Sequence, residues 1–163
     1  MEILSFFAAS AGAKKVYAVE IDHTLAEALR KSIVANDLQH VVEVVEGDIF
    51  DIETLPKNVD VVLAEIVDTA LMDELLVPAM NHLLETGVIG ESTTVLPESY
   101  PTYFQLLDAD FNYYGFKILA PRDNSIFYED SDDWLKPGIK DLSPKTVVHT
   151  INSFKTINTV DVS

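Results

Sequence analysis

The stretch Val16-Tyr17-Ala18-Val19-Glu20-Ile21-Asp22 predicts the fold of this 163-residue chain more directly than any other segment. It is a short run rich in β-branched residues that ends in carboxylates, and a helical pattern follows it. In proteins that bind dinucleotide-like cofactors, a strand of this kind ends in an acid that accepts hydrogen bonds from a ribose. The stretch therefore predicts a buried parallel strand with a sugar-binding carboxylate, Glu20, at its carboxyl end.

Two further runs repeat this pattern of a strand followed by an acid. Residues 41–48 read Val-Val-Glu-Val-Val-Glu-Gly-Asp, and residues 59–65 read Val-Asp-Val-Val-Leu-Ala-Glu. The carboxyl ends of parallel strands form the edge where ligands bind in an open α/β sheet. We therefore expect Glu20, Asp48 and Glu65 to converge on one crevice that holds a cofactor and a substrate.

Helical patterns separate these strands, which is typical of a doubly wound α/β fold. Residues 1–12 are predicted to form a first helix. Thr24 and Glu27 have the spacing of a capping box and are expected to begin the second. Residues 70–84 carry apolar side chains at helical spacing, and Pro78 is expected to kink or divide that helix.

The character of the chain changes after Pro97. Strand-forming residues replace the helical periods, and an acidic loop interrupts them. We therefore predict an incomplete Rossmann-like cofactor-binding domain over residues 1–96 and a β-rich, barrel-like segment on the substrate side over residues 97–163. The strands expected in this second segment span residues 100–107, 113–119 and 146–162.

The charge balance restricts the partners. The chain has 27 acidic and 11 basic residues, for a formal net charge of −16. Such a charge repels nucleic acid and attracts cationic partners, although it also fits a general adaptation of the surface for solubility. The four histidines lack the spacing of metal ligands, and no cysteine is present to form a disulfide, a thiolate zinc site or a nucleophile. We predict no metal site.

The sequence indicates a protein that does not enter the membrane. No uncharged run approaches the length of about 18 residues that crosses a bilayer. The apolar start, residues 1–11, lacks the basic region of a secretory leader and carries Glu2. We therefore expect a cytoplasmic location.

Taken together, the Val-Tyr-Ala-Val-Glu20, Gly47-Asp48 and Val-Asp-Val-Val-Leu-Ala-Glu65 motifs resemble class I S-adenosylmethionine-dependent methyltransferases. The segment Glu65-Ile-Val-Asp-Thr-Ala-Leu-Met-Asp-Glu74 is similar to the double-glutamate loop of the protein arginine methyltransferases. Residues 113–116 and 142–162 also resemble that family's connection into its β-barrel. The resemblance covers most of the chain.

The resemblance implies S-adenosylmethionine as cofactor and S-adenosylhomocysteine as product. Glu20, with Ile21 beside it, would bind the ribose hydroxyls. Asp48, with Gly47 and the backbone of Ile49, would bind the edge of the adenine. From the residues alone, Glu20 also fits an acid placed at a helix N-terminus, and Asp48 also fits a turn-forming aspartate.

The resemblance further implies that Glu65 and Glu74 face the substrate. A guanidinium is planar, permanently cationic and suited to bidentate carboxylates, so two acids can orient it and localise its charge. Glu74 also fits a solvated helix position. Within the loop, Val67-Asp68 and Asp73 replace small residues or glycines of the family pattern.

The family places a strand and a glycine-rich turn immediately before the Ile3-Leu4-Ser5 helix, where this sequence has Met1-Glu2. That strand would lie between the strands at residues 16–21 and 59–64. Its absence would expose two unpaired strand edges, which proteins normally cover or pair. We expect the gap to close by direct pairing of the two strands or by self-association, and hence a homo-oligomer.

The function predicted from the sequence is methyl transfer from S-adenosylmethionine to a cationic nitrogen such as that of a protein arginine side chain. Glu65 and Glu74 are the predicted catalytic residues. Two alternatives stay open. One is a methyltransferase for a small molecule or another acceptor, and the other is a non-catalytic interaction domain that has lost the donor site.

Overall fold

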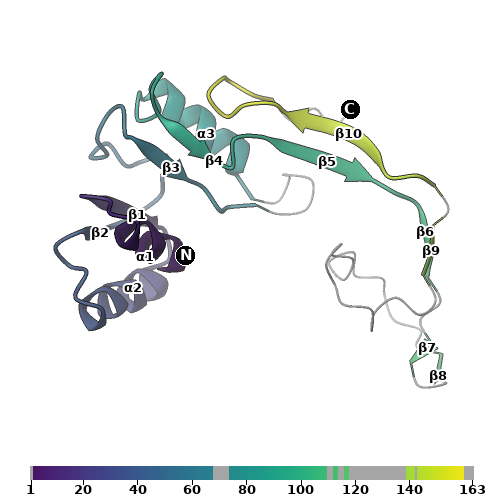
Figure 1. Ribbon diagram of the computed structural model, residues 1–163, viewed down its shortest axis with the longest axis horizontal. Helices are drawn as coiled ribbons and strands as arrows, with labels where there is room; N and C mark the ends of the chain where they lie inside the picture. The colour runs from purple at the N-terminus through teal and green to yellow at the C-terminus, as the bar shows by residue number, and fades with distance from the viewer. Residues whose placement is uncertain are drawn as a thin grey trace.

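A computed structural model of the chain describes residues 2–67, 74–109, 112–113, 116–117, 139–141 and 143–159. Its elements follow the order predicted for an α/β unit and then a β-rich segment (Figure 1). They are α1 (Glu2–Ser10), β1 (Val16–Glu20), α2 (His23–Ala35), β2 (Val42–Glu46), β3 (Val61–Leu63), α3 (Leu76–Glu85), β4 (Thr94–Leu96), β5 (Tyr100–Phe104), β6 (Leu107–Ala109), β7 (Asn112–Tyr113), β8 (Phe116–Lys117), β9 (Ile139–Asp141) and β10 (Thr146–Ile151).

The first parallel strand pair joins β1 to β2, in a register that runs from Val16 opposite Val42 to Glu20 opposite Glu46. Side chains point to opposite faces along a strand, so every second residue of β1 and β2 lies on the face that packs against α1 and α2. The buried members of this first core are Ala18 from β1, Leu29 and Ile33 from α2, and Val42 from β2.

The second parallel pair joins β3 to β4, with Val61 opposite Thr94 and Leu63 opposite Leu96. Helix α3 supplies most of the buried side chains of a second, larger core. Its buried members are Leu76, Val77, Met80, Leu83, Val88, Ile89, Val95, Ile151 and Phe154. The two pairs therefore have separate cores.

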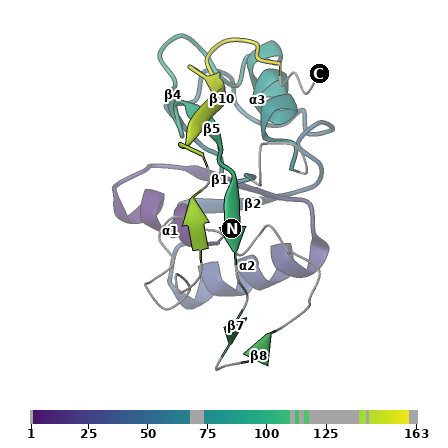
Figure 2. The ribbon, with the colours of Figure 1, turned by 90° about the vertical axis from the view of Figure 1, so that its right-hand side faces the viewer.

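The two parallel pairs are separate two-stranded sheets in the part of the chain that the structure describes. Figure 1 places the group α1, β1, α2 and β2 on one side of the group β3, α3 and β4, and Figure 2 likewise separates α1 and α2 from α3 and β4. Direct pairing of β1 with β3, one of the two ways in which we expected the gap to close, is therefore wrong. Self-association stays a prediction.

Helix α2 begins two residues earlier than the capping-box prediction requires. Its N-cap is Asp22, whose carboxylate accepts a hydrogen bond from the Leu25 N–H at 2.9 Å. The predicted box of Thr24 and Glu27 is wrong, because Thr24 lies inside the helix and the Glu27 carboxylate binds Arg30 instead. Asp22 satisfies one of the free N–H groups of the first turn.

Helix α3 is not divided by its proline. It starts at Leu76, so Pro78 is the third helical residue. N–H groups in the first turn have no intrahelical acceptor, and a proline there removes no hydrogen bond. The helix runs without a break over Leu76–Glu85. Residues 70–73 of the predicted helix lie outside the described residues.

The strands after β4 form antiparallel pairs, β5 with β10, β6 with β9 and β7 with β8. The strand predicted over residues 146–162 ends at Ile151, and its neighbours Ile151 and Phe154 enter the second core. That core therefore joins residues on both sides of the predicted boundary at residue 96. The barrel-like unit and the two-domain division stay predictions. Among the described residues, no helix has the length and apolar character needed to span a membrane.

Candidate cofactor site

Glu20 is the last residue of β1 and is half-buried at the carboxyl end of that strand. Its Oε1 accepts a hydrogen bond from the Asp22 N–H at 2.9 Å, and its backbone carbonyl accepts one from the Gly47 N–H at 3.0 Å. These bonds hold Glu20 between the turn into α2 and the end of β2. A carboxylate in this position can accept hydrogen bonds from ligand hydroxyls. The adjacent Ile21 side chain is exposed.

Asp48 follows β2 directly after a backbone turn at Gly47. Gly47 has φ +148°, in a region that side chains rarely adopt, so a glycine suits this position. Asp48 is half-buried, and its Oδ1 accepts a hydrogen bond from the Phe50 N–H at 3.0 Å. It is therefore a turn-forming aspartate, as one of the two interpretations of the sequence expected. The Ile49 side chain packs against the second core.

The strand register brings Glu20 and Asp48 to the same edge. Glu20 lies opposite Glu46, and Asp48 comes two residues after Glu46 along the chain. Since β1 and β2 are parallel neighbours, their carboxyl ends meet at one edge of the sheet, as predicted from the sequence.

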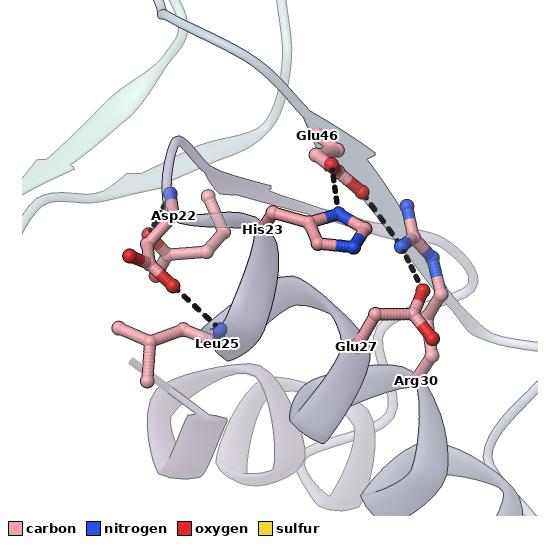
Figure 3. Close-up of polar contacts among 7 residues, drawn as sticks. Asp22, His23, Leu25, Glu27, Arg30 and Glu46 are labelled. Atoms are coloured by element: carbon pink, nitrogen blue, oxygen red, sulfur yellow. Dashed lines mark hydrogen bonds and ion pairs between the residues drawn. The ribbon is translucent and has the colours of Figure 1, made fainter.

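Glu46 is the centre of a charged cluster at this edge that the sequence analysis did not assign (Figure 3). Its Oε1 lies 2.7 Å from His23 Nδ1, and its Oε2 accepts a hydrogen bond from Arg30 Nη1 at 2.7 Å. The same Arg30 nitrogen donates to Glu27 Oε1 at 2.6 Å. His23, Glu27, Arg30 and Glu46 are called the Glu46 cluster below. The signal for this cluster in the sequence was the acid Glu46 directly before Gly47. The preceding predicted helix carries the two cationic partners, His23 and Arg30.

The cluster changes the protonation of its members. The hydrogen bond and charge of Glu46 raise the pKa of His23 above its ordinary value. The hydrogen bonds of His23 and Arg30 lower the pKa of Glu46. Both effects favour the charged forms, so the two groups form an ion pair when His23 is protonated.

Glu65 and Glu74 lie in a different part of the fold. Glu65 is exposed two residues after β3, and Glu74 is exposed two residues before α3. Their neighbours 68–73, including the altered positions Asp68 and Asp73, lie outside the described residues. Glu65 was expected to meet Glu20 and Asp48 at the edge of one sheet. The structure does not show such a shared edge, because β3 and β1 belong to separate sheets.

Comparison with known proteins identifies the family. The model of the TRM5/TYW2 methyltransferase domain matches residues 4–103, which include both parallel strand pairs, α2, α3 and most of α1. The chain belongs to this methyltransferase family. The predicted resemblance to class I S-adenosylmethionine-dependent methyltransferases is thereby confirmed, and with it S-adenosylmethionine as the cofactor of the family.

Relatives of this methyltransferase domain include arginine methyltransferases. Uncharacterized protein MJ1452 of Methanocaldococcus jannaschii is 33% identical over 133 residues, which cover 80% of this chain and 50% of that protein. Protein arginine N-methyltransferase PRMT10 of Arabidopsis thaliana is 39% identical over 95 residues, which cover 55% of this chain and 24% of that protein. The chain thus spans half or less of the length of these relatives.

A solved structure resembles this chain in fold. The Trypanosoma brucei PRMT1 enzyme-prozyme heterotetrameric complex with AdoHcy superposes with a TM-score of 0.66 at 16% identity. The match covers 96% of this chain and 50% of that chain. The Rossmann-like part of the predicted fold class is therefore confirmed.

The residues at the edge of the first sheet fit the nucleoside half of the cofactor. The Glu20 carboxylate is of the type that accepts ribose hydroxyls, and it ends a parallel strand beside the Gly47-Asp48 turn. Its side chain is not fully buried, and the hydrogen bond from the Asp22 N–H orients its carboxylate.

Proposed function

We propose that this chain is a methyltransferase that acts on a cationic nitrogen, such as that of a protein arginine side chain, and that it binds the nucleoside of its cofactor at the edge of its first strand pair. The observation that carries the proposal is the shared edge of β1 and β2, where Glu20 and the Gly47-Asp48 turn are joined by the Gly47 N–H to Glu20 carbonyl bond. Similarity to PRMT10 supports the acceptor class.

Each acid has a defined role in this proposal. Glu20 binds the ribose hydroxyls with Ile21 beside it, while Asp48, Gly47 and the Ile49 backbone border the adenine. S-adenosylmethionine supplies an activated methyl group when it is bound. The protein contributes by holding donor and acceptor in line, which reduces the entropy lost on the way to the transition state.

Glu65 and Glu74 are proposed to bind the acceptor. Two carboxylates can pair with the planar face of a guanidinium and direct its nucleophilic nitrogen toward the methyl group. Both side chains are exposed in the described structure, so they are accessible to a cationic substrate. The net charge of −16 would attract such a substrate over a longer range. The β-rich residues 97–163 are proposed to border the same side.

The first test is titration of the chain with S-adenosylhomocysteine by calorimetry. We expect binding that Glu20→Ala abolishes, because that variant removes the ribose acceptor. Glu43→Ala is the matched control, since Glu43 lies in the same strand pair near its other end, where it binds Lys15 at 2.8 Å. Absence of binding by a folded wild-type chain would contradict a cofactor site in this chain.

The second test concerns the acceptor and uses radiolabelled S-adenosylmethionine with an arginine-containing peptide and its lysine-containing counterpart. We expect labelling of the arginine peptide and its loss in Glu65→Gln, which keeps the shape of the side chain and removes its charge. Labelling that is unchanged in Glu65→Gln would contradict a carboxylate-bound cation. It would favour another acceptor.

A further inference from the structure

The turn that carries Glu20 is tied to the end of β2 by the Glu46 cluster. Glu46 is the last residue of β2, and its two carboxylate oxygens bind His23, the first residue of α2, and Arg30, seven residues further along the same helix. A single side chain thus fixes both the start and the middle of α2 relative to β2. The turn of Glu20, Ile21 and Asp22 leads directly into this fixed start of α2, so its position is restricted as well.

The other contacts of the turn are made by Asp22 and Gly47, which are next to His23 and Glu46 in the sequence. Asp22 caps α2 and its N–H binds the Glu20 carboxylate, so the position of the helix start determines where that carboxylate points. On the other side, Gly47 follows Glu46 directly and binds the Glu20 carbonyl. Figure 3 shows Asp22, His23 and Glu46 on neighbouring segments of the same edge.

We propose that Glu46, with His23 and Arg30, is a positioning residue of the nucleoside site, which holds the Glu20 turn in its binding conformation and makes cofactor affinity depend on pH. The inference rests on the proposed role of Glu20. Without the cluster, the turn samples more conformations, and binding then carries the cost of ordering it. Glu46 acts through Glu20 and does not itself contact the nucleoside.

The pH dependence follows from the groups that act on His23. These are Glu46 from β2 and Glu27 and Arg30 from α2. Their combined effect raises the pKa of His23, and Glu46 makes the largest contribution. His23 is therefore protonated and paired at acidic pH, and it keeps its proton to a higher pH than an unperturbed histidine does. Its contribution to affinity is fully present below its ordinary pKa of about 6.5 and is lost as pH rises through the raised value.

A matched pair of substitutions on one strand tests the positioning role. Glu46→Gln is expected to weaken S-adenosylhomocysteine binding by about two- to fivefold, in the range set by partly exposed ion pairs. Glu43→Gln removes the charge of another ion-paired glutamate on β2, the partner of Lys15, and should leave the affinity unchanged. Melting temperatures of both variants show whether an affinity change merely follows stability.

Two further variants test whether Glu46 acts by positioning the Glu20 turn or by contacting the ligand directly. They also keep the inference testable if Glu46→Gln fails to fold. Arg30→Gln should weaken binding as well, because it breaks the cluster from the side of the helix. His23→Gln should weaken binding at about pH 6, and its difference from wild type should shrink as the pH rises and His23 loses its proton. His40→Gln, at an exposed position before β2, is the control for removal of a histidine.

The outcomes distinguish this inference from the proposed function. If wild type binds S-adenosylhomocysteine but Glu46→Gln and Glu43→Gln bind equally well, the positioning role is wrong while the cofactor site stands. If Glu46→Gln weakens binding and Arg30→Gln does not, Glu46 contacts the ligand directly and the inference is wrong. If wild type does not bind at all, both proposals fall.

Discussion

The two parallel strand pairs of this domain are built differently. Among the described residues, the core beside the β1–β2 pair contains four buried apolar side chains, and the Glu46 cluster lies at the carboxyl edge of the pair. The core beside the β3–β4 pair contains nine buried apolar side chains, including Met80 and Phe154, two of the largest fully buried ones. The half that carries the predicted nucleoside acids therefore has the smaller apolar core.

This difference indicates a division of tasks between stability and binding. Burial of apolar area is the main favourable term in folding, so the second pair should supply most of the resistance to unfolding. The first pair keeps polar and charged groups at its edge, which is where the proposed function places the nucleoside, at the expense of burial. Three substitutions test this comparison, beginning with the largest effect.

Phe154→Ala should destabilise the protein most. Phe154 is 1% exposed in the second core, and its truncation removes a large apolar side chain and leaves a cavity. We expect a loss of about 4 kcal/mol in the free energy of unfolding, measured by urea denaturation. Phe104→Ala is the control, because Phe104 is 55% exposed and should change stability little. Equal losses in both variants would mean that Phe154 does not anchor this core.

Leu29→Ala tests the first core in the same way. Leu29 is 2% exposed on α2, and its truncation should cost about 3 kcal/mol. Leu25 lies one turn earlier on the same helix and is 54% exposed, so Leu25→Ala provides a matched control. Chemical denaturation followed by circular dichroism measures both. A larger loss for Leu29→Ala than for Phe154→Ala would reverse the comparison between the two pairs.

Asp22→Ala should have the smallest effect, because it removes one capping hydrogen bond from α2. The expected loss is about 1 kcal/mol. Thr24→Ala distinguishes the observed cap from the predicted capping box, since Thr24 lies inside the helix and should contribute less. Thermal melts of both variants measure the difference. If Thr24→Ala were the more damaging of the two, the cap would be misassigned.

Much of the fold follows from local patterns in the sequence. The runs ending in Glu20 and in Gly47-Asp48 predicted two parallel strands and their shared edge, because alternation and β-branching act within a few residues. The start of α2 was predicted less well. Asp22 and Thr24 are both favourable capping residues two positions apart, and the Leu25 N–H to Asp22 hydrogen bond in the structure shows which one is used.

Long-range features could not be predicted in the same way. The separation of β1 from β3 depends on which strands find partners, and each run taken alone predicts a strand in either arrangement. The Glu46 cluster depends on a strand register that places Glu46 beside two cations of α2. The entry of Phe154 into the second core joins segments that are far apart in the sequence.

The presence of two cores has a thermodynamic consequence. Two groups of side chains that bury their surface separately need not melt together, so heat absorption on unfolding can divide into two transitions. A ligand stabilises only the cooperative unit that binds it. A nucleoside held by Glu20 and Asp48 would then raise the melting temperature of the β1–β2 unit and leave that of the unit around Phe154 unchanged.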